Sequence, residues 1–150
     1  MTTKERIVAD LKAAMKAGDN VVRDTLRMLD SAIKNIEIEK KKREEGLGEE
    51  EVLEVVMRAV KQRVDSISQY EQGGRSELAD KERGELEILK RYLPEQLGEE
   101  QVRAVVREVI STLGEKASLG AVMGQAMTRL KGKADGNLVR KIAAEELAVK

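Results

Sequence analysis

The sequence contains no histidine, no cysteine, no phenylalanine and no tryptophan. Without cysteine there are no disulfides and no thiolate chemistry, and without histidine the commonest general base and the usual zinc ligand are missing. These absences exclude Ser-His-Asp and Cys-His active sites, and also the di-iron pattern that needs histidine. The only aromatic residues are Tyr70 and Tyr92, so any core has to be built from aliphatic side chains.

Long uncharged apolar runs are also absent, and the first residues do not form a basic-then-apolar leader. Nothing in the sequence therefore points to export or to membrane insertion. We expect a soluble cytoplasmic protein with no membrane partner.

Proline occurs once, at Pro94 in the stretch RYLPEQLG, and Ala, Leu, Glu, Lys and Arg are abundant. This composition favours helix over sheet, and apolar residues recur at helical spacing on both sides of the proline. We predict an all-α protein with a four-helix N-terminal subdomain (residues 1–94) and a small three-helix C-terminal subdomain (residues 95–150), because Pro94 cannot continue a helix.

Helix starts can be placed from side chains that accept hydrogen bonds from free backbone amides. Thr2, Ser76 and Ser118 are expected caps of this kind, and the stretch Gly18-Asp19-Asn20 is expected to end one helix and cap the next. The stretch LGEEEV (47–52) recurs as LGEEQV (97–102), which we interpret as two similar helix starts rather than a duplication.

Charge is balanced overall, with 28 basic and 28 acidic residues, but it is not evenly spread. Residues 1–94 carry 19 basic and 20 acidic side chains, whereas residues 103–141 carry eight basic and three acidic ones. A surface that attracts phosphate is therefore expected in the C-terminal subdomain. The basic cluster Lys40–Arg43 is interpreted as a helix end, since Glu44 and Glu45 follow it directly.

No motif meets the requirements of an active site. Gly132-Lys133 lacks the upstream glycine and the following Ser or Thr of a phosphate-binding Walker loop. Ser31 and Lys34 would share a helix face, as the catalytic pair of a Ser-Lys amidase requires, but such a pair is expected by chance in a chain with 28 basic residues. We predict no catalytic residue, no metal site and no cofactor.

The most specific stretch is LGAVMGQAMTRLKGKADGNLVRK (119–141). Gly120 and Gly124 lie one helical turn apart, and glycine inside a helix costs about 1 kcal/mol relative to alanine. Close packing of a neighbouring helix is the favoured reason, and close approach of a nucleic-acid backbone is the alternative. Gly132 and Gly136 in the following turn are the other candidate positions for such an approach.

The candidate phosphate contacts are Arg129, Lys131, Lys133, Arg140 and Lys141. A merely solvated charged face is an equal alternative for these cations.

Three stretches together resemble the YqeY-like family: TLRMLDSAIKNIEIEK (25–40), YEQGGRSELADKERGELEILKRYLPEQL (70–97) and LGAVMGQAMTRLKGKADGNLV (119–139). That family is similar to the C-terminal part of the B subunit of glutamyl/aspartyl-tRNA amidotransferase. The resemblance implies a helical linker body, a small helical tail that contacts tRNA, and chemistry carried out elsewhere. The family's label of carbon–nitrogen ligase with glutamine as amide donor is inherited from the multidomain enzyme, and no residue here supports that reaction unaided.

Two functional hypotheses follow. The first is a non-catalytic accessory module that binds tRNA or is related in function to the tRNA amidotransferase. The second is a protein-interaction module that docks to an amidotransferase or an aminoacyl-tRNA synthetase. A subunit that assists transamidation in trans is a third and weaker option.

Overall fold

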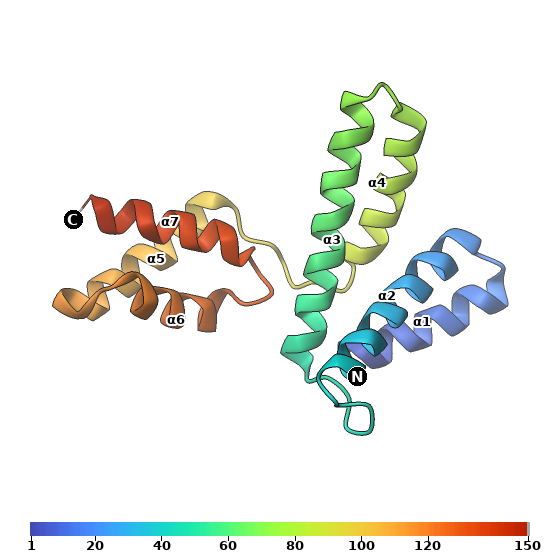
Figure 1. Cartoon of the computed structure of the whole chain (residues 1–150), viewed down its shortest axis with the longest axis horizontal. Helices are drawn as coiled ribbons and strands as arrows, with labels where there is room; N and C mark the ends of the chain where they lie inside the picture. Colours follow the sequence, from blue (N-terminus) through green and yellow to red (C-terminus); the bar gives the residue numbers. More distant parts are fainter. Residues whose placement is uncertain (150) are drawn as a thin grey trace. The chain divides into compact units, whose positions relative to one another are not determined.

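The computed structural model of this chain describes residues 1–149. Regular structure in these residues is helical throughout, with no strand, and this confirms the all-α prediction. The helices, shown in Figure 1, are α1 (Thr3–Ala17), α2 (Asn20–Glu39), α3 (Glu49–Gln72), α4 (Ser76–Lys90), α5 (Glu99–Leu113), the short 3-10 helix η1 (Gly114–Lys116), α6 (Leu119–Leu130) and α7 (Gly136–Ala148).

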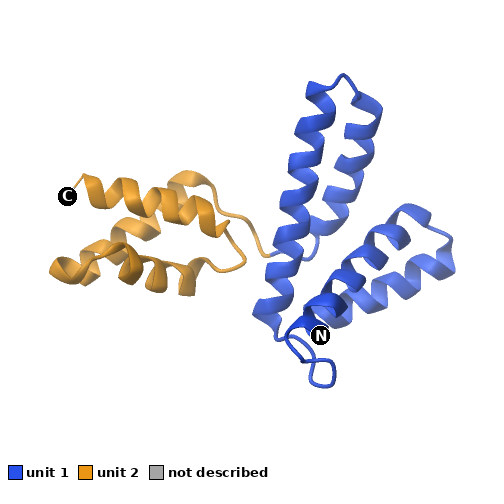
Figure 2. Ribbon diagram, in the orientation of Figure 1, with its two compact units in different colours: residues 1–93 blue, residues 94–150 orange. Residues whose placement is uncertain are grey.

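Contacts along the chain divide it into two compact units, residues 1–93 and residues 94–150 (Figure 2). We call them the N-terminal unit and the C-terminal unit. The first holds α1 to α4, and the second holds α5, η1, α6 and α7. Pro94 is the first residue of the C-terminal unit.

The predicted caps at Thr2 and Ser118 and in the stretch Gly18-Asp19-Asn20 are confirmed, and in that stretch the cap is Asp19. Thr2 Oγ1 accepts from the Glu5 amide, Asp19 Oδ1 from the Val22 amide, and Ser118 Oγ from the Ala121 amide, each at 3.2 Å. The prediction for Ser76 was wrong, because α4 begins at Ser76 itself and the preceding Arg75 makes no side-chain cap. The turn before α4 is closed ahead of Ser76: Gly74 adopts a left-handed conformation (φ 72°), and the Arg75 amide donates to the Tyr70 carbonyl.

The repeated LGEE stretch marks two helix starts, as predicted. Gly48 and Gly98 are the N-caps of α3 and α5. Each glycine amide donates to the side chain three residues later, at 3.2 Å to Glu51 and at 2.9 Å to Gln101. The recurrence therefore reflects the chemistry of starting a helix rather than a repeated domain.

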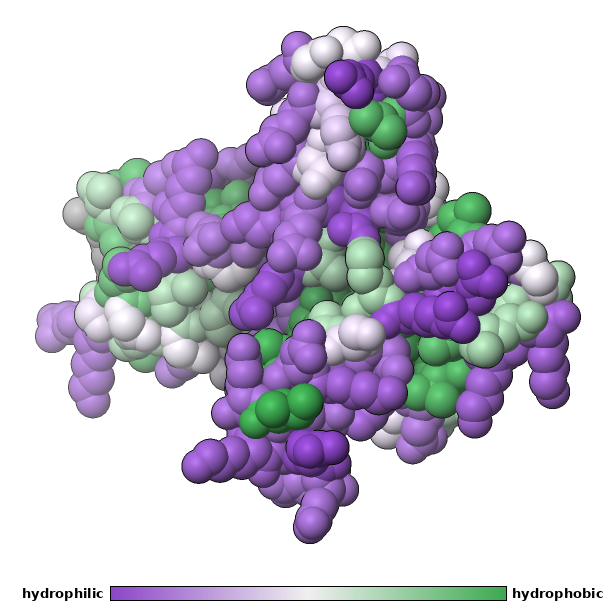
Figure 3. Space-filling model, turned by 45° about the vertical axis from the view of Figure 1, so that its right-hand side comes forward, coloured by the Kyte–Doolittle hydropathy of each residue, from purple (hydrophilic) through white to green (hydrophobic). Residues whose placement is uncertain are grey.

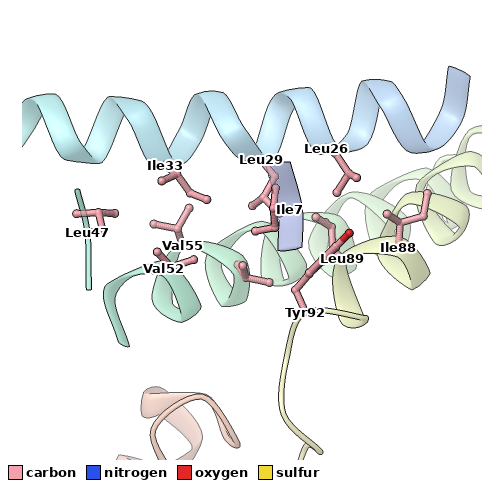
Figure 4. Close-up of a cluster of buried hydrophobic side chains, with 11 residues drawn as sticks. Ile7, Leu26, Leu29, Ile33, Leu47, Val52, Val55, Ile88, Leu89 and Tyr92 are labelled. Atoms are coloured by element: carbon pink, nitrogen blue, oxygen red, sulfur yellow. The ribbon is translucent and has the colours of Figure 1, made fainter. Parts of the chain in front are cut away.

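The N-terminal unit consists of two helical hairpins, α1–α2 and α3–α4, that share one hydrophobic core. On α2 the inward face carries Leu26, Leu29 and Ile33, which follow one another at helical spacing and are buried. Figure 4 shows these side chains meeting residues of α1, α3 and α4. The buried cluster comprises Ile7, Leu26, Leu29, Ile33, Leu47, Val52, Val55, Val56, Ile88, Leu89 and Tyr92.

Ion pairs hold the segment between α2 and α3. Lys40 Nζ and Lys42 Nζ bind the two carboxylate oxygens of Glu51 at 2.8 and 2.9 Å. Buried Glu37 accepts from Lys4 Nζ at 2.6 Å and from the Leu47 amide at 3.1 Å. Two lysines of the basic cluster after α2, Lys40 and Lys42, therefore have a structural role, and they bind the first turn of α3 rather than the end of α2.

The C-terminal unit is a bundle of three helices in which α6 runs back along α5 and α7 returns in the direction of α5 (Figure 1). Its core contains no aromatic side chain. The buried residues are Val102, Val106, Val109, Ile110, Val122, Ala126, Leu130, Ala134, Val139, Ile142 and Ala143.

Candidate nucleic-acid interface

The turn between α6 and α7 carries the candidate site, and its backbone is well defined by hydrogen bonds. The Leu130 carbonyl accepts from the Lys133 amide at 2.8 Å and from the Ala134 amide at 3.1 Å. Gly132 has φ of 79°, a left-handed conformation that glycine adopts without strain. Leu130 and Ala134 are buried and anchor the turn at both sides. We call residues 131–135 the cationic turn.

Residues 96 and 97, which precede α5, bind the same turn through two hydrogen bonds. Gln96 Nε2 donates to the Gly132 carbonyl at 2.7 Å, and the Leu97 amide donates to the Lys133 carbonyl at 2.9 Å. These contacts join parts of the chain 36 residues apart. The pattern of helices in the sequence gives no signal for them, and Gln96 was not among the predicted site residues.

Among the five predicted phosphate contacts, Lys133, Arg140 and Lys141 are exposed and make no ion pair or side-chain hydrogen bond within residues 1–149. Lys133 lies in the cationic turn, and the other two lie in the second turn of α7, which begins at Gly136. A helix rises 1.5 Å per residue, so only about 7 Å of helix separates the start of α7 from these two residues. Three available cations therefore lie within a short stretch of the chain, from the cationic turn to the second turn of α7.

The other two predicted contacts have different surroundings. Arg129 Nη1 pairs with Glu108 Oε2 on α5 at 3.2 Å, and both side chains are about half exposed or more. An exposed pair of this kind contributes about 0–1 kcal/mol, so a phosphate can displace the glutamate. Lys131 is half-buried.

Elsewhere in this unit the arginines of α5 are neutralised. Arg103 binds Glu99, Glu145 and Glu146 at 2.8–3.1 Å, and Arg107 binds Glu146 at 3.0 Å. These hydrogen bonds, that of Glu146 first, raise the pKa of Arg103, while Arg107 and then Arg103 lower the pKa of Glu146. The excess of positive charge predicted for residues 103–141 is thus confined mainly to the cationic turn and the start of α7.

The amino terminus of α7 is already capped by a carboxylate. Asp135 Oδ1 accepts from the Asn137 amide at 3.3 Å. The cap places a negative charge at the amino terminus of α7, where free helix amides would otherwise help to hold a phosphate. Cationic side chains, rather than these amides, are left as the main phosphate ligands of the site.

The candidate glycines fall into two groups. A Cβ added at Gly120 or Gly124 would meet nothing within 4 Å, so the interpretation of close helix packing was wrong: both residues lie on the exposed face of α6. At Gly136 a Cβ would meet only Met127 Cε at 3.9 Å, an ordinary contact distance. Gly132 is needed for its left-handed backbone. Close approach of a nucleic-acid backbone to these glycines stays a prediction.

The described part of the chain offers no metal centre, since its Asp and Glu residues nowhere gather in a group of three or more suited to hold a metal ion. No described helix is both long and apolar enough to cross a membrane.

Comparison with known proteins gives two findings. The model of a family described as Yqey-like protein matches residues 4–147. Among curated proteins, the chain is similar to altered inheritance of mitochondria protein 41, mitochondrial, of Kluyveromyces lactis, with 40% identity over 83 residues that make up 55% of this chain and 44% of that protein. The protein of the same name in Clavispora lusitaniae is 42% identical over 84 residues, covering 56% of this chain and 47% of its own length. The match thus spans less than half of these relatives. Their names are those of mitochondrial proteins, and a cytoplasmic location for this chain stays a prediction.

Proposed function

Because the chain belongs to the YqeY-like family, we propose that it is a non-catalytic accessory module whose C-terminal unit binds the phosphate backbone of tRNA. The observation that carries the proposal is that Lys133, Arg140 and Lys141 are exposed, have no ion pair within residues 1–149, and lie in the cationic turn and the second turn of α7. The neighbouring arginines of α5 are held by glutamates. Three of the four exposed cations without an ion pair in the described part of this unit therefore lie in the cationic turn and α7, and Lys116 in η1 is the fourth.

Phosphate is the ligand chemistry that suits such a surface. Exposed lysine and arginine side chains that are free of carboxylates can release the counterions of a polyanion, and this release drives nucleic-acid binding. Three contacts predict modest affinity with a marked dependence on salt. Binding should weaken by about 40-fold between 50 and 200 mM salt if each contact neutralises one phosphate of a double-helical segment.

A structured RNA suits this unit better than a single strand. Single-stranded RNA is usually bound by stacking its bases on aromatic rings. The C-terminal unit has no aromatic residue, since Tyr70 and Tyr92 both precede Pro94. Recognition therefore has to use backbone charge and shape, and the resemblance to the amidotransferase tail makes tRNA the RNA class to test.

The test compares two identical charge reversals in one unit. Lys133→Glu changes the cationic turn, whereas Lys116→Glu changes an exposed lysine of η1, which precedes the opposite end of α6. We expect Lys133→Glu to lower the affinity for total tRNA by about tenfold or more, the scale of one lost phosphate contact plus repulsion. Lys116→Glu should stay within about twofold of the wild type. Equal losses in the two variants would contradict the assignment.

Protein docking is the second candidate function, and exposed apolar side chains of the N-terminal unit favour it. Val21 and Met28 lie two turns apart on α2 and are 58% and 52% exposed. Figure 3 shows that apolar residues on the visible face form small patches among hydrophilic ones. Patches of this kind suit a transient partner such as an amidotransferase or an aminoacyl-tRNA synthetase. A protein that co-purifies with the chain after nuclease treatment would support docking, and loss of all co-purifying material would support RNA binding.

A further inference from the structure

Gln96 makes an unusual pair of contacts beside the candidate site. Its Nε2 atom donates to the Pro94 carbonyl at 2.8 Å and to the Gly132 carbonyl at 2.7 Å. The next residue, Leu97, donates its amide to the Lys133 carbonyl at 2.9 Å. Two consecutive residues before α5 thus bind two consecutive carbonyls of the cationic turn.

The chemistry of the side-chain amide fixes this arrangement. The NH2 group has two hydrogens, and each has one carbonyl acceptor here. Turning the amide over would place its oxygen against two carbonyl oxygens, which repel it. A carboxylate or a thioether at this position would have no hydrogen to donate.

The contacts leave Lys133 with both of its backbone groups held. Its amide donates to the Leu130 carbonyl at the end of α6, and its carbonyl accepts from Leu97. The preceding residue, Gly132, is fixed by Gln96 in a left-handed conformation. A side chain that starts from a fixed backbone loses less conformational freedom when it binds a ligand, so it binds more tightly.

We propose that Gln96 is a positioning residue for phosphate binding, which holds the cationic turn so that Lys133 meets the RNA backbone from a fixed point. This inference rests on the proposed function, since it assigns a role in the same site. Gln96 itself need not touch the RNA.

The test uses Gln96→Met, which keeps the side-chain length and charge but removes both donated hydrogen bonds. We expect the affinity for total tRNA to fall about fivefold to tenfold, the effect of about one net hydrogen bond. In a Lys133→Ala background the same substitution should have no further effect, because Gln96 acts through Lys133. Amide hydrogen exchange at Leu97 should speed up in Gln96→Met, which reports the loosened turn without any RNA.

The matched control is Gln101→Met, in the first turn of α5. It loses a hydrogen bond to Gly98 but none to the turn. An equal loss of affinity in Gln101→Met, or additive effects of Gln96→Met and Lys133→Ala, would overturn the positioning role and indicate general weakening of the unit. If the wild type binds tRNA and Gln96→Met binds it with the same affinity, the positioning role of Gln96 is overturned while the proposed function stands. Absence of wild-type binding at low salt would overturn the proposed function along with it.

Discussion

Individual carboxylates determine which basic side chains of this chain are held in ion pairs, and Glu51 is the clearest case. Two lysines and the Gly48 amide converge on its carboxylate. The hydrogen bonds from Lys40 first, and then from Lys42, lower the pKa of Glu51 from its ordinary 4.5 to about 2. Two lysines of the basic cluster after α2 thereby join α2 to the first turn of α3.

The lowered pKa of Glu51 predicts a specific dependence of stability on acid. Because the folded pKa lies below the unfolded one, the carboxylate contributes its full stabilisation above pH 4.5 and loses it as the pH falls from 4.5 through 2. Glu51→Gln should therefore be less stable than the wild type at pH 7, with a gap that narrows toward pH 3. Urea unfolding at the two pH values measures this gap. Glu44→Gln, at an exposed position before α3, is the control and should show no such change. A gap of equal size at both pH values would contradict the account.

At the scale of the element, α6 combines an apolar inner face with an outer face that contains Gly120 and Gly124. Alanine in a helix interior is more favourable than glycine by about 1 kcal/mol, and nothing lies within 4 Å of a Cβ at Gly124. Gly124→Ala should therefore raise the free energy of unfolding by about 0.5–1 kcal/mol, measured by urea denaturation.

Gly132→Ala is the contrasting variant. It should lower that free energy by about 1 kcal/mol or more, because φ of 79° is unfavourable for alanine.

The same helix variant separates two roles for the exposed glycines. If an RNA backbone approaches α6 closely, Gly124→Ala should be more stable than the wild type but bind tRNA more weakly. If the cationic turn alone makes the contacts, stability should rise while affinity stays the same. The binding curve of this single variant therefore tests the prediction of backbone approach directly.

At the scale of the whole molecule, the sequence predicts local structure well and distant pairing poorly. The spacing of Leu26, Leu29 and Ile33 predicts a buried face, and the caps at Thr2, Asp19 and Ser118 predict helix starts, because both depend on neighbours within a few residues. The all-α class and the family resemblance are confirmed for the same reason, since they follow from the pattern and order of such segments.

The candidate site shows where that reasoning ends. Three contacts of the C-terminal unit depend on how its helices pack together. They join Arg129 to Glu108, Arg103 to Glu146, and Gln96 to Gly132. No local pattern in the sequence distinguishes a paired cation from an available one. The five predicted phosphate contacts therefore differ in ways that only the fold reveals: Arg129 is paired, Lys131 is half-buried, and Lys133, Arg140 and Lys141 are exposed.

The most direct test of the central claim is the slope of log K against log salt concentration for tRNA binding, measured by fluorescence anisotropy. The triple variant Lys133→Ala, Arg140→Ala, Lys141→Ala removes the three proposed phosphate contacts, and Lys12→Ala, Lys16→Ala, Arg58→Ala removes three exposed cations of the N-terminal unit as a control. We predict that the first triple variant flattens the slope by about three units, one for each phosphate contact, and that the control keeps the wild-type slope. Equal slopes in the wild type and the first triple variant would show that these side chains do not contact phosphate, and would contradict the account.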